Sequence, residues 1–177
     1  MTTANIVSAI QRLRVVFTRR PEAALHADAP AIARWERGLR VVCRDANGAR
    51  IATDLPREIG GEGNEVTPGW LLRAALASCL ASRIALEAAA RGIRITGLEV
   101  TAASESDARG LLGMSDAAGV RIPPEPRAVQ LRVRVAAASA GAETLRAMIE
   151  DSHRGSPVGC AVEHSVPLRL EIDIEPE

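Results

Sequence analysis

The segment from Leu71 to Ala90 is apolar or small at nearly every position, and it constrains the fold more than any other segment. Thr67-Pro68 precedes it as an N-cap followed by proline at the first helical position, and Gly92 follows it as a helix stop. The pattern predicts a helix that ends near Arg91. Because a helix that is apolar nearly all round is buried nearly all round, we expect the central helix of the domain, covered on more than one side.

Patterns on both sides of this helix indicate an α+β fold. Residues 30–53 alternate as an antiparallel meander of short strands, with Gly38 at one turn and Asn47-Gly48, a two-residue hairpin signal, at the other. The other predicted elements are strands at 93–103, 128–138 and 166–174 and helices at 4–20, 142–154 and 157–163. The first of these helices is amphipathic and ends at Pro21, so we expect an N-terminal helical extension (residues 1–27) followed by one domain (residues 28–177).

Composition narrows the chemistry that is available to the chain. It has 177 residues, 47% of them apolar, which suits a single domain with a core of its own. A net charge of +0 and 2% aromatic residues argue against nucleic acid and anionic membranes as partners. Lysine and tyrosine are absent, which excludes a Schiff-base lysine, a phosphate-loop lysine and a catalytic tyrosine. Charged residues interrupt the most apolar segment and polar residues interrupt the N-terminus, so we expect neither a membrane span nor a signal peptide.

Three cysteines, Cys43, Cys79 and Cys160, are too few and too far apart for the disulfide framework of a secreted domain. A reducing cytoplasm is therefore the expected compartment. Cys160 and His164 have the spacing of a metal pair or of a Cys–His dyad, but two ligands do not make a metal site, and we expect neither metal nor cofactor. His153 is interpreted as a surface residue.

Cys79 is the candidate nucleophile, because it lies about three turns into the central helix. One interpretation is a buried cysteine that acts as a small hydrophobic residue. The other depends on Arg83, which follows four residues later on the same helix face and could favour the thiolate, the nucleophilic form. Arg83 could equally form an ion pair with Glu87. Ser156 precedes Pro157 and is interpreted first as the N-cap of the short helix at 157–163.

The order of these motifs resembles the OsmC/Ohr family of osmotically induced and organic-hydroperoxide-resistance thiol peroxidases. The resemblance is most specific in the run Pro-x-x-Leu-Leu-x-Ala-Ala-Leu-Ala-Ser-Cys at residues 68–79. It continues through Asp54-Leu55-Pro56, Gly60-Gly61, the Arg-Gly-Leu-Leu-Gly loop at 109–113 and Ser156-Pro157-Val158, and it covers roughly residues 28 to 175. It implies an intertwined homodimer in which long helices lie between antiparallel sheets, with two active sites at the subunit interface.

The resemblance also implies site residues. Cys79 matches the family's helix-borne cysteine, which attacks the peroxide, and Arg37 lies closest to the strand arginine that helps to ionise it. The family's glutamate falls on Gly69 and its disulfide-forming second cysteine on Ser156, so neither of these groups is kept in place. Glu62 or Glu65 could replace the carboxylate, and Cys160, one helical turn beyond Ser156, could replace the thiol.

Two functions follow from this set. The first is thiol-dependent reduction of organic hydroperoxides, a stress-response activity, with Cys79 as peroxidatic nucleophile, Arg37 and Arg83 as its cationic neighbours, and Cys160 or an external dithiol as reductant. The second is a dimeric relative without peroxidase activity that binds a small apolar ligand or senses oxidants. Because Cys160 sits roughly 6 Å along a helix axis from the family's second cysteine, we expect no Cys79–Cys160 disulfide in the resting fold.

Overall fold

The computed structural model describes residues 3–164 and 166–175 of the chain. Its elements are α1 (Thr3–Arg19), the 3₁₀ helix η1 (Pro21–Ala24), β1 (Ile32–Arg37), β2 (Arg40–Arg44), β3 (Arg50–Thr53), the 3₁₀ helix η2 (Arg57–Ile59), α2 (Pro68–Ala90), β4 (Ile95–Glu105), α3 (Ala108–Leu111), β5 (Ala128–Ala137), α4 (Ala142–Arg154) and α5 (Pro157–Glu163). The architecture is α+β, as the sequence predicts.

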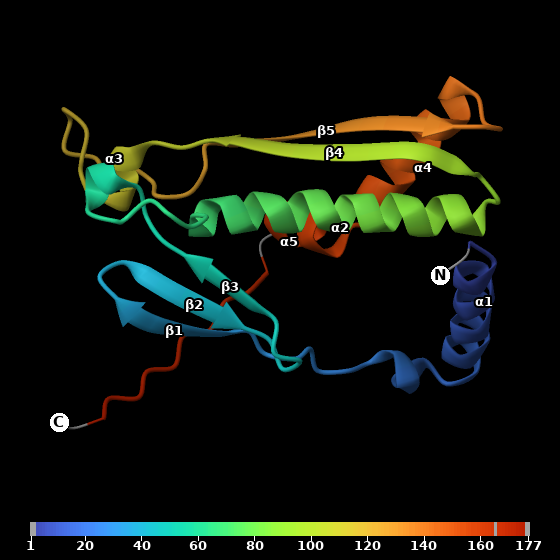
Figure 1. Ribbon diagram of the computed structural model, residues 1–177, viewed down its shortest axis with the longest axis horizontal. Helices are drawn as coiled ribbons and strands as arrows, with labels where there is room; N and C mark the ends of the chain where they lie inside the picture. Colours follow the sequence, from blue (N-terminus) through green and yellow to red (C-terminus); the bar gives the residue numbers. More distant parts are fainter. Residues whose placement is uncertain (1–2, 165, 176–177) are drawn as a thin grey trace.

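Two separate antiparallel sheets flank α2, which runs between them in Figure 1. One sheet is the meander β1-β2-β3, and the other pairs β4 with β5 along almost their whole length. Helices α4 and α5 follow β5 and pack against α2. The long helix therefore packs against α1, β4, α4 and α5.

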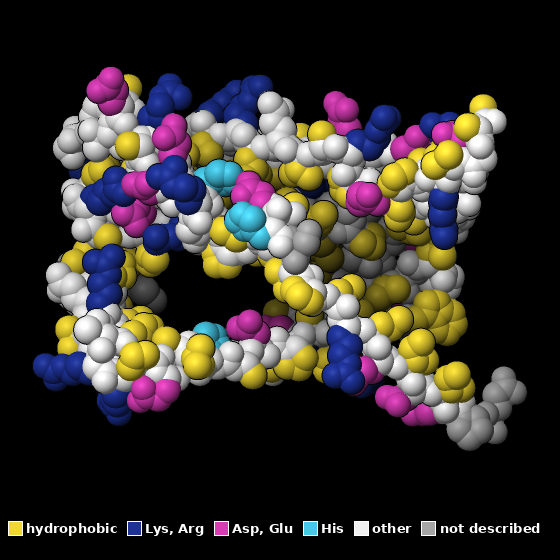
Figure 2. Space-filling view, turned by 180° about the vertical axis from the view of Figure 1, so that it is seen from behind, with side chains coloured by type: hydrophobic (Ala, Val, Ile, Leu, Met, Phe, Trp, Pro, Cys, Tyr) yellow, Lys and Arg dark blue, Asp and Glu magenta, His cyan; other side chains and the backbone are white. Residues whose placement is uncertain are grey.

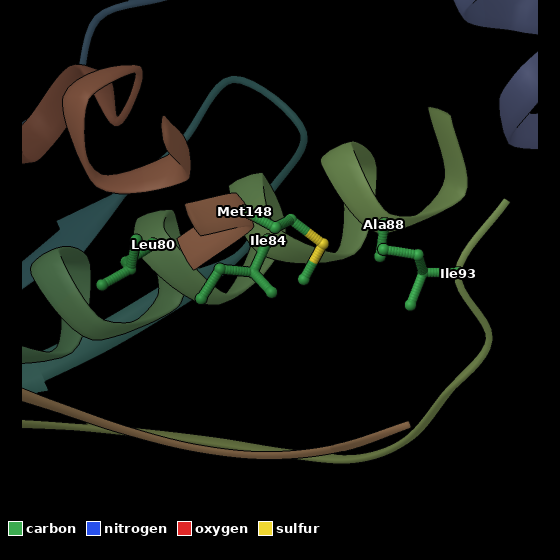
Figure 3. Packing of buried hydrophobic residues seen from close by; sticks show 5 residues of the cluster. All are labelled: Leu80, Ile84, Ala88, Ile93 and Met148. Carbon is green, nitrogen blue, oxygen red and sulfur yellow. The ribbon is translucent and has the colours of Figure 1, made fainter. Parts of the chain in front are cut away.

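Helix α2 begins and ends where its sequence signals predict. The Thr67 hydroxyl accepts a hydrogen bond from the Trp70 N–H at 3.1 Å, Pro68 opens the helix, and Gly92 follows it with φ +68°. One face of α2 carries the core: Leu80, Ile84 and Ala88 pack with Met148 of α4 and with Ile93, as Figure 3 shows. Ile84 and Met148 are fully buried.

The expectation that α2 is buried nearly all round is wrong within a single chain. Trp70, Leu72 and Leu86 of this helix are 48%, 37% and 41% exposed. The reason is that β4, α4 and α5 cover one face only, while the β1-β2-β3 sheet stands away from the other. In Figure 2 an opening runs right through the molecule beside this face.

The predicted final strand at 166–174 is also not formed. Residues 166–175 are extended but hydrogen-bond to no strand among the described residues, and they run out past the β1-β2-β3 sheet in Figure 1. Their alternating apolar side chains point into solvent: Leu168 is 97% exposed, and Val166, Leu170, Ile172 and Ile174 are exposed as well. Alternation specifies a face that can be buried, but a strand forms only beside a partner strand.

The second hairpin of the meander, β2-β3, differs in its turn from the prediction. Arg44 pairs with Arg50, so five residues rather than two connect β2 and β3. Asp45 organises this loop, since its carboxylate accepts hydrogen bonds from the N–H groups of Asn47 and Ala49. Gly48 takes the positive φ of +88° that the longer loop needs. Helix α1, which has the predicted boundaries, packs against α2.

Among the described helices, α2 alone is long and apolar enough to cross a membrane. The core helix of a globular domain meets the same criterion of length and composition. Arg73, inside this helix, donates a hydrogen bond to the Ser104 hydroxyl of β4 at 3.1 Å, and Glu87 accepts from Arg91. These contacts tie α2 into the domain.

Candidate functional site

Cys79 projects from α2 toward the start of α5, where it meets Ser156. The Ser156 hydroxyl donates a hydrogen bond to the Cys79 sulfur at 3.3 Å. Ser156 is only 1% exposed, and Cys79 is half-buried. Ser156 does occupy the N-cap position of α5, as expected, but its side chain caps nothing; its hydroxyl is used on the thiol instead.

Arg83 lies one turn after Cys79 on α2, and its guanidinium pairs with Glu87 at 3.3 Å. This is the ordinary ion pair that the i, i+4 spacing allows. The guanidinium also rests on Gly155: a Cβ atom on this glycine would lie 2.9 Å from Arg83 Nε. Arg83 therefore covers the turn that presents Ser156.

Cys160 lies on α5, and its thiol takes no part in the Cys79–Ser156 hydrogen bond. Its thiol donates a hydrogen bond to the Arg154 carbonyl at 3.3 Å, and all three cysteines are free thiols. His164 is the C-cap residue of α5, and its N–H donates to the Cys160 carbonyl at 2.9 Å; the side chains of Cys160 and His164 form no hydrogen bond with each other. Cys43 is half-buried in the middle of β2.

Arg37 lies far along the chain from Cys79, at the end of β1, in a group of paired charges that we call the arginine–glutamate cluster (Glu36, Arg37, Arg40, Glu62 and Glu65). Arg37 donates two hydrogen bonds to Glu62, at 3.2 and 3.1 Å, and is 62% exposed. Arg40 donates to Glu65 at 2.6 Å and to Glu36 at 3.0 Å. The two carboxylates that could replace the one missing at Gly69 are thus bonded to arginines of the meander.

Asp54 holds the glycine-rich loop in the shape that brings Glu62 to Arg37. Burial raises the pKa of this carboxyl, but hydrogen bonds from the N–H groups of Leu55, Glu62 and Gly63 outweigh burial and leave the pKa below its ordinary value. Gly61 lets the loop close, since a Cβ atom there would lie 1.8 Å from the Leu55 carbonyl oxygen. Hydrogen bonds from Arg37, then from Asn64, lower the pKa of Glu62.

A cavity of about 540 Å³ lies between β5 and helices α2, α4 and α5; Cys79 and Ser156 are not among the residues that line it. Leu76 and Leu80, which bracket Cys79 on α2, form part of its wall, and Gly159 of α5 forms another part. The rest of the wall is mostly aliphatic, from Leu131, Val133, Ile149 and Val162. Such a space suits a small apolar molecule.

His153 and Glu163, which the sequence analysis did not assign to the site, line the same cavity. The imidazole Nε2 lies 3.1 Å from a Glu163 carboxylate oxygen, and the Nδ1 atom is buried with no hydrogen-bond partner among the described residues. We call Cys79, Ser156, His153 and Glu163 the thiol cluster. The one sequence signal for His153 is its place in the last turn of α4, three residues before Ser156.

The described residues contain no group of three or more His, Cys, Asp or Glu side chains that could hold a metal ion. The groups near Cys79 are a hydroxyl, an imidazole and apolar walls. Their chemistry is therefore that of a thiol, hydrogen bonding and proton transfer.

A comparison with protein families assigns the chain to a family. The family model described as OsmC-like protein matches residues 61–171, which include α2, both long strands, α4 and α5. The chain belongs to the OsmC-like family. No functionally curated protein matches it.

Solved OsmC-like structures share the fold. An OsmC-like protein of unknown function from Vibrio cholerae is 17% identical, with a TM-score of 0.62 over 78% of this chain and 95% of that one. One from Mycoplasma pneumoniae is 14% identical, with a TM-score of 0.64 over 80% and 91%. An organic hydroperoxide resistance protein from Legionella pneumophila is 20% identical, with a TM-score of 0.53 over 78% and 93%. At these identities the likeness concerns the fold alone.

Proposed function

We propose that this OsmC-like protein reduces organic hydroperoxides, with Cys79 as the nucleophile. The observation that carries the proposal is the Cys79 sulfur itself, which accepts a hydrogen bond from a buried hydroxyl, on a helix whose neighbouring Leu76 and Leu80 line an apolar cavity. A hydroxyl that donates to sulfur favours the thiolate, which is the form that attacks peroxides. The resemblance of the fold to a protein named for organic hydroperoxide resistance supports the same substrate class.

The proposed reaction transfers one oxygen atom. The Cys79 thiolate attacks the hydroxyl oxygen of the hydroperoxide, an S–O bond forms, and the O–O bond breaks. The sulfur supplies two electrons and becomes a sulfenic acid, while the alkoxide that leaves takes one proton and departs as an alcohol. The aliphatic cavity wall would hold the organic part of the peroxide.

The return to the thiol would use an external reductant. Cys160, the candidate within the chain, is bonded to the Arg154 carbonyl, and Ser156 stands at the thiol where a second cysteine would be needed. One external thiol would displace water from the sulfenic acid to form a mixed disulfide, and a second thiol would release Cys79. A dithiol performs both steps, and the reducing cytoplasm is the compartment that supplies one.

We also propose a homodimer. The exposed face of α2 and the exposed apolar side chains of residues 166–175 leave a large apolar surface that a second copy can cover. Within one chain Arg37 is bonded to Glu62, so a contribution of Arg37 to a thiol would come across this interface. Arg83, one turn from Cys79, is the candidate cation from the same chain. Sedimentation at micromolar concentration is expected to give a dimer, and a stable folded monomer would contradict it.

The test of the activity is the loss of an organic hydroperoxide in the presence of a dithiol. We expect the wild-type chain to consume it and the Cys79→Ser variant to fall to the uncatalysed rate. Cys43→Ser, which removes a half-buried thiol from β2, is the matched control and should retain the activity. Wild-type turnover that equals that of Cys79→Ser would refute the proposal.

A second function, binding of a small apolar ligand or sensing of oxidants without turnover, is favoured by a specific observation. Gly69 leaves α2 without a carboxylate in its first turn, and the carboxylates of the neighbouring loop are bonded to Arg37 and Arg40. The cavity would then be the functional feature. Under this alternative, one equivalent of hydroperoxide oxidises Cys79 once, and added dithiol gives no further consumption.

A further inference from the structure

We propose that Ser156 and His153 form a proton relay that takes the thiol proton of Cys79 and delivers it to the leaving oxygen of the peroxide, with Glu163 holding the imidazole in place. The inference rests on the proposed function, because Cys79 must be the reacting thiol. It assigns the activation of that thiol to two residues of the chain's own helices α4 and α5.

The first link is the Ser156 hydroxyl. It is almost fully buried, it does not cap α5, and its donated hydrogen bond goes to the Cys79 sulfur at 3.3 Å. A hydroxyl both donates and accepts hydrogen bonds, so a buried hydroxyl next to a sulfur can accept the thiol proton while it donates its own hydrogen to another acceptor. Ser156 is thus connected to the reacting atom itself.

The second link is the unpartnered nitrogen of His153. A neutral imidazole carries one N–H and one acceptor nitrogen, and Glu163, as an acceptor-only carboxylate 3.1 Å from Nε2, assigns the hydrogen to Nε2. Nδ1 is then the acceptor. It is buried and has no hydrogen-bond partner among the described residues, and a buried polar atom of this kind requires an explanation.

Gly159 supplies the explanation, because its missing side chain leaves the space between the two links. A Cβ atom on Gly159 would lie 3.5 Å from Ser156 Oγ and 4.0 Å from His153 Nδ1. Both polar atoms therefore lie within 4 Å of one point beside Gly159, and the relay requires one water molecule that bridges them. The route runs from the Cys79 sulfur through Ser156 and this space to His153, and it ends at Glu163.

The proton balance of the relay is complete. The thiol proton passes to Ser156 Oγ as the serine hydrogen moves toward Nδ1, which leaves a thiolate and an imidazolium. When the thiolate attacks the hydroperoxide, the alkoxide that leaves takes the proton back from His153, which lines the cavity. The products are the sulfenic acid of Cys79 and an alcohol, and the imidazole returns to its neutral form.

Several ionisable groups lie around this imidazole. Glu163 of α5 is paired with it, Glu150 of α4 and Arg127 before β5 line the same cavity, and Cys79 of α2 is bonded to Ser156. Arg83 of α2 lies on Gly155, between His153 and Ser156 in the chain.

The test is the rate at which iodoacetamide alkylates Cys79 between pH 5 and 9, measured for each cysteine by peptide mass spectrometry. Three variants interrupt the relay at different points: Ser156→Ala, His153→Gln and Gly159→Ala. Each is expected to slow alkylation of Cys79 at pH 7 by about tenfold, the effect of losing a hydrogen bond to a charged group, and to move the midpoint of its pH profile upward. The rates at Cys43 and Cys160 should not change.

Gly159→Ala is the sharpest of the three variants, because it touches no member of the relay chemically. Its new methyl group meets its neighbours at ordinary contact distances and improves the helix propensity of α5, so a merely structural role predicts no loss. Gly69→Ala, another helical glycine with ordinary contacts, is its matched control. Ser152→Ala, which removes a fully buried hydroxyl bonded to the Met148 carbonyl, is the control for Ser156→Ala.

Wild-type alkylation of Cys79 in folded Ser156→Ala, or in both folded His153→Gln and folded Gly159→Ala, overturns the relay. Melting curves by circular dichroism establish that each variant is folded. The relay and the proposed function fail separately, because alkylation needs no peroxide. Slower alkylation without any wild-type hydroperoxide turnover supports the activation of Cys79 by Ser156 and His153, and it refutes the peroxidase together with the delivery of the proton to a peroxide. Normal turnover in His153→Gln refutes the relay and leaves the peroxidase in place.

Discussion

The thiol cluster and the arginine–glutamate cluster lie on different sides of α2, and they differ in how far their polar groups are paired. In the arginine–glutamate cluster, Arg37 and Arg40 are each bonded to at least one carboxylate, and the Arg37–Glu62 pair is at least half exposed. In the thiol cluster, Cys79 is bonded to a neutral hydroxyl, and one polar atom, His153 Nδ1, has no partner among the described residues. In the arginine–glutamate cluster both arginines are paired with carboxylates, whereas in the thiol cluster one acceptor nitrogen has no hydrogen bond among the described residues.

The difference shows where reactive chemistry can arise in this chain. A fully paired ion pair at the surface has little left to offer a substrate, and solvent screens it. A buried acceptor nitrogen without a hydrogen-bond partner destabilises a fold. Its presence in the same cluster as Cys79 therefore indicates a functional role for His153. The arginines dominate the sequence pattern, but the hydrogen bond that the Cys79 sulfur accepts comes from a neutral hydroxyl.

The largest effect is expected from joining the two helices of the thiol cluster covalently. In Ser156→Cys, the new sulfur would replace a hydroxyl 3.3 Å from the Cys79 sulfur, so mild oxidation with diamide should form a disulfide. Closing so long a loop should stabilise the oxidised variant by about 4 kcal/mol, measured by urea unfolding with and without reductant.

The wild-type chain is the control for this experiment. The Cys160 thiol is bonded away from Cys79, so diamide should leave no Cys79–Cys160 disulfide in the wild-type peptide map. Recovery of that disulfide would show that Cys160 takes the role of the second cysteine that the family resemblance implies. The interpretation that Cys79 depends on neutral groups of the thiol cluster would then be wrong.

Gly61→Ala should produce the next largest effect, and on the other side of α2. The new Cβ atom would lie 1.8 Å from the Leu55 carbonyl oxygen, which forces the loop that carries Glu62 to move. We expect a loss of about 3 kcal/mol or more in urea unfolding. The alkylation rate of Cys79 in the folded variant should stay at the wild-type value, because the two clusters are separate. A slower rate would show that they are coupled.

Asp54→Asn should have a smaller effect that depends on pH. Folding lowers the pKa of Asp54 below 3.8, so its carboxylate stabilises the fold above that pH and this contribution is lost as the pH falls through the lower, folded value. The variant should melt a few degrees below wild type at pH 7, and the difference should shrink toward pH 3. A difference that is the same at both pH values would contradict the assignment.

Glu62→Gln should have the smallest effect. The Arg37–Glu62 pair is exposed on both sides, and water and salt screen such pairs. We expect the melting temperature to change by no more than about 2 °C, with little dependence on salt concentration. A larger loss that high salt removes would show that the arginine–glutamate cluster stabilises the sheet.

The sequence by itself determined the elements whose signals are local. The boundaries of α2 follow from Thr67, Pro68 and Gly92, because caps and breakers act on the backbone within one turn. The predicted helix at 142–154 has the boundaries of α4, and the run at residues 68–79 indicated the family that the comparison then confirmed. Each of these inferences needed only neighbours along the chain.

Tertiary structure decided the features that depend on partners far away in the sequence. The strand predicted at 166–174 does not form, since no described strand lies beside it, and the exposed face of α2 awaits a covering surface that one chain does not supply. The site was decided in the same way. Ser156 signalled a helix cap, and its hydroxyl instead bonds a sulfur 77 residues away along the chain. His153 signalled a surface residue, and its side chain is 42% exposed, but only the packing of α5 against α4 brings Glu163 to one of its nitrogens and Gly159 near the other. Helical spacing cannot anticipate these contacts, because the chain turns at Gly155 between the two helices.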